Sequence, residues 1–169
     1  MNRERLNNIF IVCGEGYTFS KFYLKKNSVF LIYVNFPDPW PKRRHQKNRL
    51  VNLNFVEEVK RTLKQGKTIF FVTDDKETLK SIKEQIFSSG SFISFFKDPY
   101  YVNEIKNYGS SYFDSLWRSK GKKIYYLRFI KKVGTEGFEP PTYWSQTSRA
   151  NQTALCPEHI NFNLKKSFL

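Results

Sequence analysis

A chain of 169 residues with 18% aromatic side chains can bury one substantial core, and this composition excludes low-complexity disorder over most of its length. The net charge of +14 favours a polyanionic partner such as nucleic acid, although a lysine-rich composition alone would give the same value. Cys13 and Cys156 form no metal-binding spacing and no disulfide framework, and no apolar run approaches the roughly 18 residues of a membrane span. We therefore expect a cytosolic protein without a metal site or a membrane partner.

The first elements lie before residue 35. Residues 9–13 are apolar and predict a short buried strand, which ends in the turn sequence Gly14-Glu15-Gly16. Residues 17–26 predict a short helix or a loop. Residues 29–34 form a continuous apolar run, which is typical of a strand buried on both faces.

The stretch from residue 35 to residue 50 is the most informative part of the chain. Three prolines stiffen the backbone around Asp38 and Trp40, directly after the strand at 29–34. Five lysines and arginines follow within residues 42–49. Ligands of open α/β sheets bind beyond the carboxyl ends of the strands, so a fixed carboxylate beside cations there suits chemistry on a polyanion. Taken separately, each half is also a common surface pattern, a turn or a solvated helix start.

Further along, a helix is predicted from Arg49 to Gln65, with Gly66 as the residue that ends it. A buried strand at 67–72 follows and leads into Asp74. Another helix comes next and has Gly90 beyond its end. Asp74 can cap this helix together with Glu77 three residues later, or face the ligand cleft, and the two roles are compatible.

Two aromatic-rich strands are predicted at 91–97 and 122–130, and we expect them to pair as an antiparallel hairpin at the end of the domain. The connection between them, residues 98–121, is long for a compact domain. Long connections are usually functional or disordered, and the tyrosines and tryptophan of this one argue against disorder.

Read as a whole, the string Asn-Phe-Pro-Asp-Pro-Trp-Pro-Lys at 35–42, followed by an Arg/His/Lys-rich stretch, resembles the signature of the bacterial tRNA (guanine-N7)-methyltransferase family. The resemblance covers about residues 7–131. It implies an α/β, Rossmann-like fold that uses S-adenosylmethionine, and transfer of its methyl group to N7 of a guanosine in tRNA. The cofactor and the tRNA partner are expectations from this resemblance.

The resemblance also implies roles for individual residues. Asp38 is expected to be the catalytic carboxylate at the junction of cofactor and base, and Glu15 is expected to bind the cofactor with it. Substrate contacts are implied for Lys42, Asp74, Ser111 and Asp114, and tRNA phosphate contacts for Arg43, Arg44, His45, Lys47 and Arg49. Glu15, Ser111 and Asp114 are conservative replacements of the family's Asp, Thr and Glu. Trp40 can either stack on the base or pack under the loop.

Two features depart from the family. The glycine loop that would bind the cofactor after a first strand is absent from the sequence. We therefore expect an amino-terminally truncated, incomplete fold with impaired activity. A separately encoded fragment is the one expected source of the missing part. Residues 133–169 resemble a peptide that recurs where a reading frame runs into a tRNA gene. We expect a domain at 1–132 and an adventitious or disordered tail at 133–169. A non-catalytic RNA-binding remnant and a decayed reading frame that does not fold stably are the alternatives.

Overall fold

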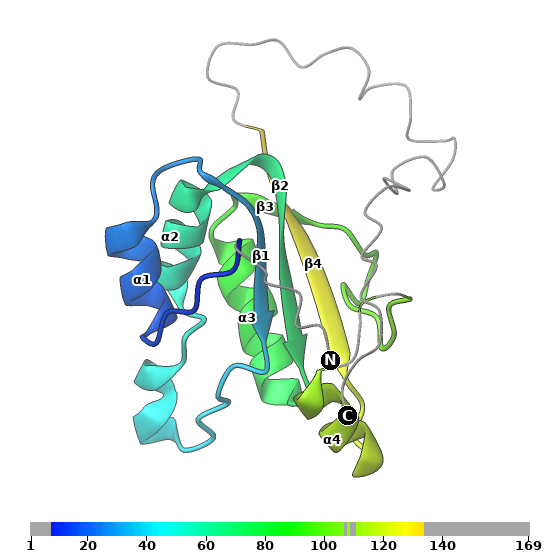
Figure 1. Ribbon diagram of the computed structural model, residues 1–169. Coiled ribbons are helices and arrows are strands. Elements are labelled where there is room, and N and C mark those ends of the chain that lie inside the picture. Colours follow the sequence, from blue (N-terminus) through cyan, green and yellow to red (C-terminus); the bar gives the residue numbers. More distant parts are fainter. Residues whose placement is uncertain (1–7, 107, 109–110, 134–169) are drawn as a thin grey trace, which may run out of the picture. The chain divides into compact units, whose positions relative to one another are not determined.

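In the computed structural model, residues 8–106, 108 and 111–133 are described, and a four-stranded sheet with the order β1-β2-β4-β3 runs through them (Figure 1). The strands are β1 (Val29–Asn35), β2 (Leu63–Thr73), β3 (Phe92–Ser94) and β4 (Tyr125–Lys131). β1 and β2 are parallel, whereas β4 is antiparallel to both of its neighbours, β2 and β3. The mixed α/β class and the antiparallel pairing of the two late strands are therefore confirmed.

Three helices cover one face of this sheet: α1 (Gly16–Tyr23), α2 (Leu53–Thr62) and α3 (Lys76–Ser88) (Figure 1). The main core lies between them and the sheet, where apolar helix faces meet the inward side chains of β2 and β4. Its fully buried members include Val56, Val59, Phe71, Ile82 and Leu127. No helix among the described residues is long and apolar enough to cross a lipid bilayer.

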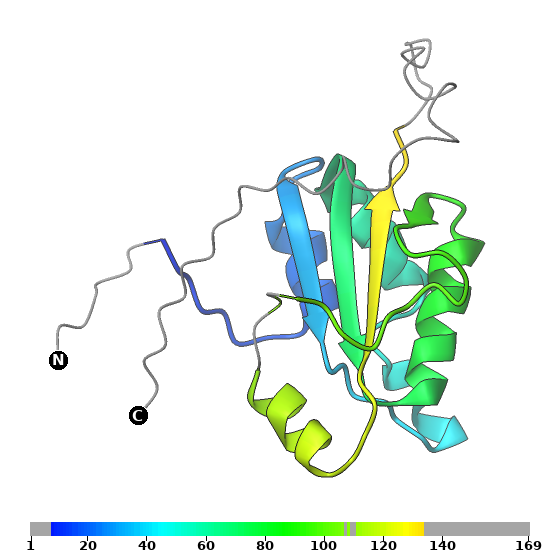
Figure 2. The same cartoon turned by 90° about the vertical axis from the view of Figure 1, so that its right-hand side faces the viewer.

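The opposite face of the sheet is covered differently. A segment running from β3 to residue 106 crosses it, and α4 (Tyr112–Ser119) lies at the end where β1 and β2 terminate (Figure 2). A smaller apolar cluster there joins Val72, Ile124 and Tyr126 to side chains of this crossing segment and of α4. Toward the two edges of the sheet the covering is thin, since Tyr33 is 47% and Ile93 44% exposed.

The predicted buried strand at residues 9–13 is wrong. The segment is not a strand, and its side chains from Ile9 to Val12 are between 59% and 94% exposed. An apolar segment becomes a strand only where a neighbour completes its hydrogen bonds, and within the described part of the chain no strand pairs with it.

The predicted end of the second helix is also wrong. α2 begins after the N-cap Asn52, whose side chain accepts a hydrogen bond from Phe55 N, and it already ends at Thr62. The next residue, Leu63, is fully buried as the first residue of β2. Gly66 lies inside this strand with φ of 68°, beside an irregularity in the β1–β2 register, and does not end the helix. Burying Leu63 in the sheet thus outweighs continuing the helical pattern.

Three further boundaries differ from the predictions. Asp75, not Asp74, is the N-cap of α3 and accepts a hydrogen bond of 2.7 Å from Thr78 N. The strand expected at 91–97 is reduced to the three residues of β3, and the strand expected at 122–130 occurs as β4. The connection 98–121 is not loop throughout, because it contains α4. Residues 134–169 lie outside the described residues, so the division at residue 132 and the tail's nature remain predictions.

Candidate functional site

The loop at residues 36–41 follows the carboxyl end of β1 and is held in an uncommon conformation. Phe36 and Trp40 have φ of 49° and 42°, in the left-handed region that bulky side chains rarely adopt. Phe36 N donates to Val72 O at 2.8 Å, and Arg49 Nε donates to Pro39 O at 2.8 Å. Such backbone strain costs about 1–3 kcal/mol per residue and concentrates at functional sites. The loop is therefore the first candidate for a site.

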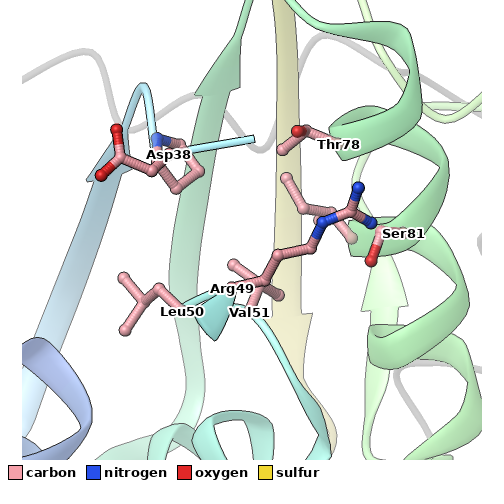
Figure 3. Close-up of a pocket in the computed structure, with 8 residues that line it drawn as sticks. Asp38, Arg49, Leu50, Val51, Thr78 and Ser81 are labelled. Atoms are coloured by element: carbon pink, nitrogen blue, oxygen red, sulfur yellow. The ribbon is translucent and has the colours of Figure 1, made fainter. Parts of the chain in front are cut away.

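Asp38 is exposed on this loop and lines a small pocket (Figure 3). The other lining residues come from the loop, the segment before α2 and the first turns of α3: Pro37, Arg49, Leu50, Val51, Thr78, Ser81 and Ile82. Figure 3 shows the Asp38 carboxylate turned away from the Arg49 guanidinium, which lies on the Ser81 side of the pocket. The carboxylate is thus presented outward, where its oxygens can accept N–H donors of a ligand.

Four of the predicted RNA-binding residues, Arg43, Arg44, His45 and Lys47, lie on a short 3-10 helix, η1 (Arg43–Asn48), directly after the loop, and Arg49 follows this helix. Lys42, Arg44 and Lys47 are exposed. His45 is half-buried, accepts a hydrogen bond of 3.1 Å from Arg44 Nε, and meets the Trp40 ring edge-on at 5.8 Å between centroids. Of the two roles considered for Trp40, this contact favours packing within the loop. Lys42, Arg44 and Lys47 thus form an exposed positive rim in the segment that follows Asp38, which suits phosphate groups.

Asp74 lies at the carboxyl end of β2 and forms an ion pair that the sequence analysis missed. Lys122 Nζ is 2.5 Å from Asp74 Oδ2, and the same ammonium lies 3.9 Å from the centroid of the Trp117 ring. The side chain of Asp74 is 14% exposed and that of Lys122 45%. The partners are 48 residues apart, and no pattern in the sequence indicates the pairing.

Ser111 is the N-cap of α4 and Asp114 lies in its first turn, and both make hydrogen bonds within the fold. Ser111 Oγ caps the helix by accepting from Asp114 N at 3.1 Å. The Asp114 side chain accepts from Tyr126 Oη at 2.7 Å and from Arg118 Nε at 3.2 Å. Asp114 is only 8% exposed. The burial of Tyr126 and its hydrogen bond to Asp114 raise the pKa of Tyr126. These contacts fix α4 to β4, and substrate roles for the two residues remain predictions.

One hydrogen bond and one ring contact join α4 and the segment before it to the end of β1. Tyr108 Oη donates to Asn35 Oδ1 at 2.7 Å, and burial raises the pKa of Tyr108. Phe113 of α4 lies 6.0 Å from Phe36, measured between ring centroids. The carboxyl ends of β1 and β2 and the start of α4 therefore lie close together at one end of the sheet. The sequence analysis did not identify Asn35 or Tyr108 as members of this group.

Glu15 has a local role of its own. Its carboxylate caps α1 by accepting from Thr18 N at 3.0 Å and from the Thr18 hydroxyl. These hydrogen bonds, the one from the hydroxyl first, lower the pKa of Glu15. The residue is exposed, and its expected role toward a cofactor remains a prediction.

Comparison with known proteins gives a consistent result. A family described as "Putative methyltransferase" matches residues 1–127. A tRNA (guanine-N(7)-)-methyltransferase of Chlamydia caviae is 43% identical over 138 residues, and one of Chlamydia muridarum is 47% identical over 137; each match covers 79% of this chain and 59% of the relative. One from Clostridium botulinum is 34% identical over 103 residues, which is 61% of this chain and 48% of that protein. The chain thus spans about three-fifths of the length of the chlamydial relatives.

Proposed function

The chain belongs to the tRNA (guanine-N7)-methyltransferase family, and from this premise we propose that its described residues form the tRNA-facing part of a site that methylates N7 of a guanosine in tRNA. The observation that carries the proposal is the strained loop at 36–41. This loop presents Asp38 outward, beside a pocket and a rim of cations, at the end of a parallel strand where α/β folds bind ligands.

The chemistry places modest demands on these residues. Guanine N7 has a lone pair in the plane of the neutral base, so it can attack a methyl group without first losing a proton. S-adenosylmethionine would supply that methyl group on a sulfonium. The protein's task is then alignment, which can remove several kcal/mol of the barrier. Asp38 would accept N–H donors of the guanine, hold its plane in place, and stabilise the positive charge that the base acquires.

The remaining residues would position the substrate around Asp38. Lys42 and Asp74 would hold the target nucleotide, Asp74 in the orientation that its ion pair with Lys122 fixes. The predicted RNA-binding residues of this segment would contact tRNA phosphates: Arg43, Arg44, His45, Lys47 and Arg49. Arg49 has a second task, because its hydrogen bond to Pro39 O braces the loop that carries Asp38.

The described residues could bind only part of S-adenosylmethionine. The carboxylates of Glu15 and Asp38 can accept hydrogen bonds from amine and hydroxyl groups of S-adenosylmethionine. The described residues contain no glycine turn after a strand that could offer backbone N–H groups to its methionine end. The exposed cations after Asp38 support a second candidate function, RNA binding by this chain without methyl transfer.

Titration of the purified chain with tRNA and with S-adenosylmethionine tests the proposal. We expect the affinity for tRNA to fall steeply between low and high salt, because phosphate contacts release counterions. The variant Arg44→Gln/Lys47→Gln should reduce the slope of log affinity against log salt by about 1–2. The matched control is Lys60→Gln/Lys80→Gln, which removes the same charge from exposed positions of α2 and α3.

The outcomes separate the candidates. An equal reduction by both double variants would mean that charge alone, and not the rim beside Asp38, binds the tRNA. Saturable binding of S-adenosylmethionine would support methyl transfer by this chain itself, whereas tRNA binding without it would favour the second candidate. Absence of salt-sensitive tRNA binding would contradict both.

A further inference from the structure

The two edge strands of the sheet differ in a way that points to a binding surface. β3 is a three-residue edge, and short edges are a common device against pairing with other chains. β1 has seven residues, Val29–Asn35, with no charged side chain and no proline. An irregularity lies between Val29 and Leu31, but residues 31–35 pair with β2 in regular register. A long, uncharged, regular edge is what natural proteins avoid leaving open.

The backbone of β1 is ready to accept a further strand. Phe36 N donates toward β2, and N–H groups alternate in direction along a strand, so the amides of Tyr33 and Asn35 point to the other edge. Within the described residues the sheet has no strand beyond β1. These amides and the carbonyls beside them are therefore available for one more ladder.

The face of the sheet next to this edge carries apolar side chains without a helix over them. α1, α2 and α3 all lie on the other face, as Figure 2 shows with the sheet in front of them. The Tyr33 ring stacks on Phe70 at 5.1 Å and is still 47% exposed. Sheets with parallel strands are usually covered by helices on both faces. A further strand on β1 would thus be expected to bring a helix onto this open face.

The start of the described chain also carries exposed apolar side chains. Phe10 and Ile11 are 88% and 94% exposed, and the segment lies on the β1 side of the sheet (Figure 2). Adjacent exposed apolar residues of this size mark surfaces that another polypeptide covers. The edge, the open face and this segment together describe one surface, which we call the β1 surface.

We propose that the β1 surface binds a polypeptide that adds a strand parallel to β1 and a helix on the open face, and that this partner is the part of a methyltransferase domain that this chain does not match. The occupant is argued from two observations: the chain covers only 59% of its chlamydial relatives, and β1 already runs parallel to β2. α/β sheets bind ligands at a switch point, which lies between two neighbouring strands whose helical connections run on opposite faces of the sheet. That point lies at the carboxyl end of β1, beside Asp38.

This inference deepens the proposed function and rests on it in naming the partner, which would bring the glycine loop for the cofactor. The test reads binding and not methyl transfer, so the two can fail separately. The probe is the part of the Chlamydia muridarum protein that this chain does not match, expressed as a separate polypeptide and mixed with the full chain. Sedimentation should show a one-to-one complex.

Amide hydrogen exchange should show where the polypeptide binds. We expect exchange of the Tyr33 and Asn35 amides to slow at least tenfold in the complex. The amides of Ile32 and Val34 point to β2 and should change little, which makes them the internal control.

A matched pair of variants tests the added strand. Tyr33→Ala and Tyr33→Pro both lose the ring, but only the proline loses the N–H at the free edge, and it spares the ladder with β2. We expect the proline variant to bind at least tenfold more weakly than the alanine variant, with both melting cooperatively. The exchange measurement on the unchanged chain decides the question if the proline variant does not fold.

Three results would overturn the proposal. The first is the absence of a complex at micromolar concentrations. The second is a complex that leaves the Tyr33 and Asn35 amides exchanging as before. The third is self-association of the chain alone that protects the same amides, since the occupant would then be a second copy.

Discussion

Asp38 and Asp114 are both implied as site residues by the same resemblance, yet they lie in opposite settings. Asp38 is exposed on a strained loop beside a pocket, with its carboxylate turned outward. Asp114 is 8% exposed and is bound by Tyr126 and Arg118. A carboxylate whose oxygens are already satisfied contributes to stability, whereas an exposed one on a strained loop is available to a ligand. The contrast makes Asp38 the better candidate for contacting substrate and shows that Asp114 holds α4 in place.

The largest effect is expected from Asp38→Asn. The change keeps the size of the side chain but removes its charge. We expect the rate of methyl transfer to tRNA to fall about 10²-fold because the base is no longer aligned. The rate is measured for the chain alone and for the chain mixed with the polypeptide proposed to bind the β1 surface. Stability should change by less than about 0.5 kcal/mol because the side chain is exposed. Kinetics and urea unfolding of the same preparation measure the two effects. An unchanged rate would remove Asp38 from the mechanism.

Asp114→Ala should show the reverse pattern. It leaves Tyr126 and Arg118 without their acceptor, so we expect the free energy of unfolding to fall by about 2 kcal/mol. Tyr126→Phe removes one of these hydrogen bonds and should cost about 1 kcal/mol. Urea unfolding of the two single variants and the double variant gives the coupling between the residues. Additive losses would show that the hydrogen bond in the structure does not contribute to stability.

The general course of the fold could be predicted from sequence because local patterns carry it. The apolar run at 29–34 and the helical spacing of α3 are both local signals, and both elements occur. The prediction that the strand at 29–34 is buried on both faces is wrong, since Phe30 is 57% and Tyr33 47% exposed. Boundaries failed where tertiary burial overrode the pattern, as at Leu63, which leaves the helix to enter the sheet. The strand expected at 9–13 failed for another reason: pairing depends on a neighbour, and the pattern of a single segment does not say whether one is present.

The candidate site was predictable only in part. The loop carrying Asp38 could be found because prolines, one carboxylate and a run of cations are contiguous in the sequence. Lys122 and Tyr126 could not, since their partners lie 48 and 12 residues away and the contacts depend on how α4 packs against the sheet. The strain at Phe36 was likewise out of reach, because it arises from tertiary contacts of the loop.

A smaller effect is expected at the ion pair between Lys122 and Asp74, which is intermediate between the two settings. Lys122→Met keeps the stem over Trp117 but removes the charge that compensates Asp74. We expect a loss of about 1 kcal/mol in the free energy of unfolding, discounted because the Lys122 side chain is 45% exposed. If Asp74 also positions the nucleotide, tRNA affinity should fall in this variant and in Asp74→Asn. Loss of stability with unchanged tRNA affinity in both variants would assign Asp74 to the structural group with Asp114.

The smallest effect is expected on stability at alkaline pH, through the two tyrosines that join α4 and the segment before it to the end of the sheet. Burial raises the pKa of Tyr108 and of Tyr126, and the Asp114 carboxylate beside Tyr126 adds to it, while Arg118 opposes it. Because the folded protein binds these protons more tightly than the unfolded chain, their contribution is complete below about pH 10 and declines as the pH rises beyond it. We expect urea midpoints to fall between pH 9 and 11, and less steeply in Tyr126→Phe. The same slope in this variant would show that Tyr126 titrates alike in the folded and unfolded states, and the contacts that join α4 to β4 would then not depend on its proton.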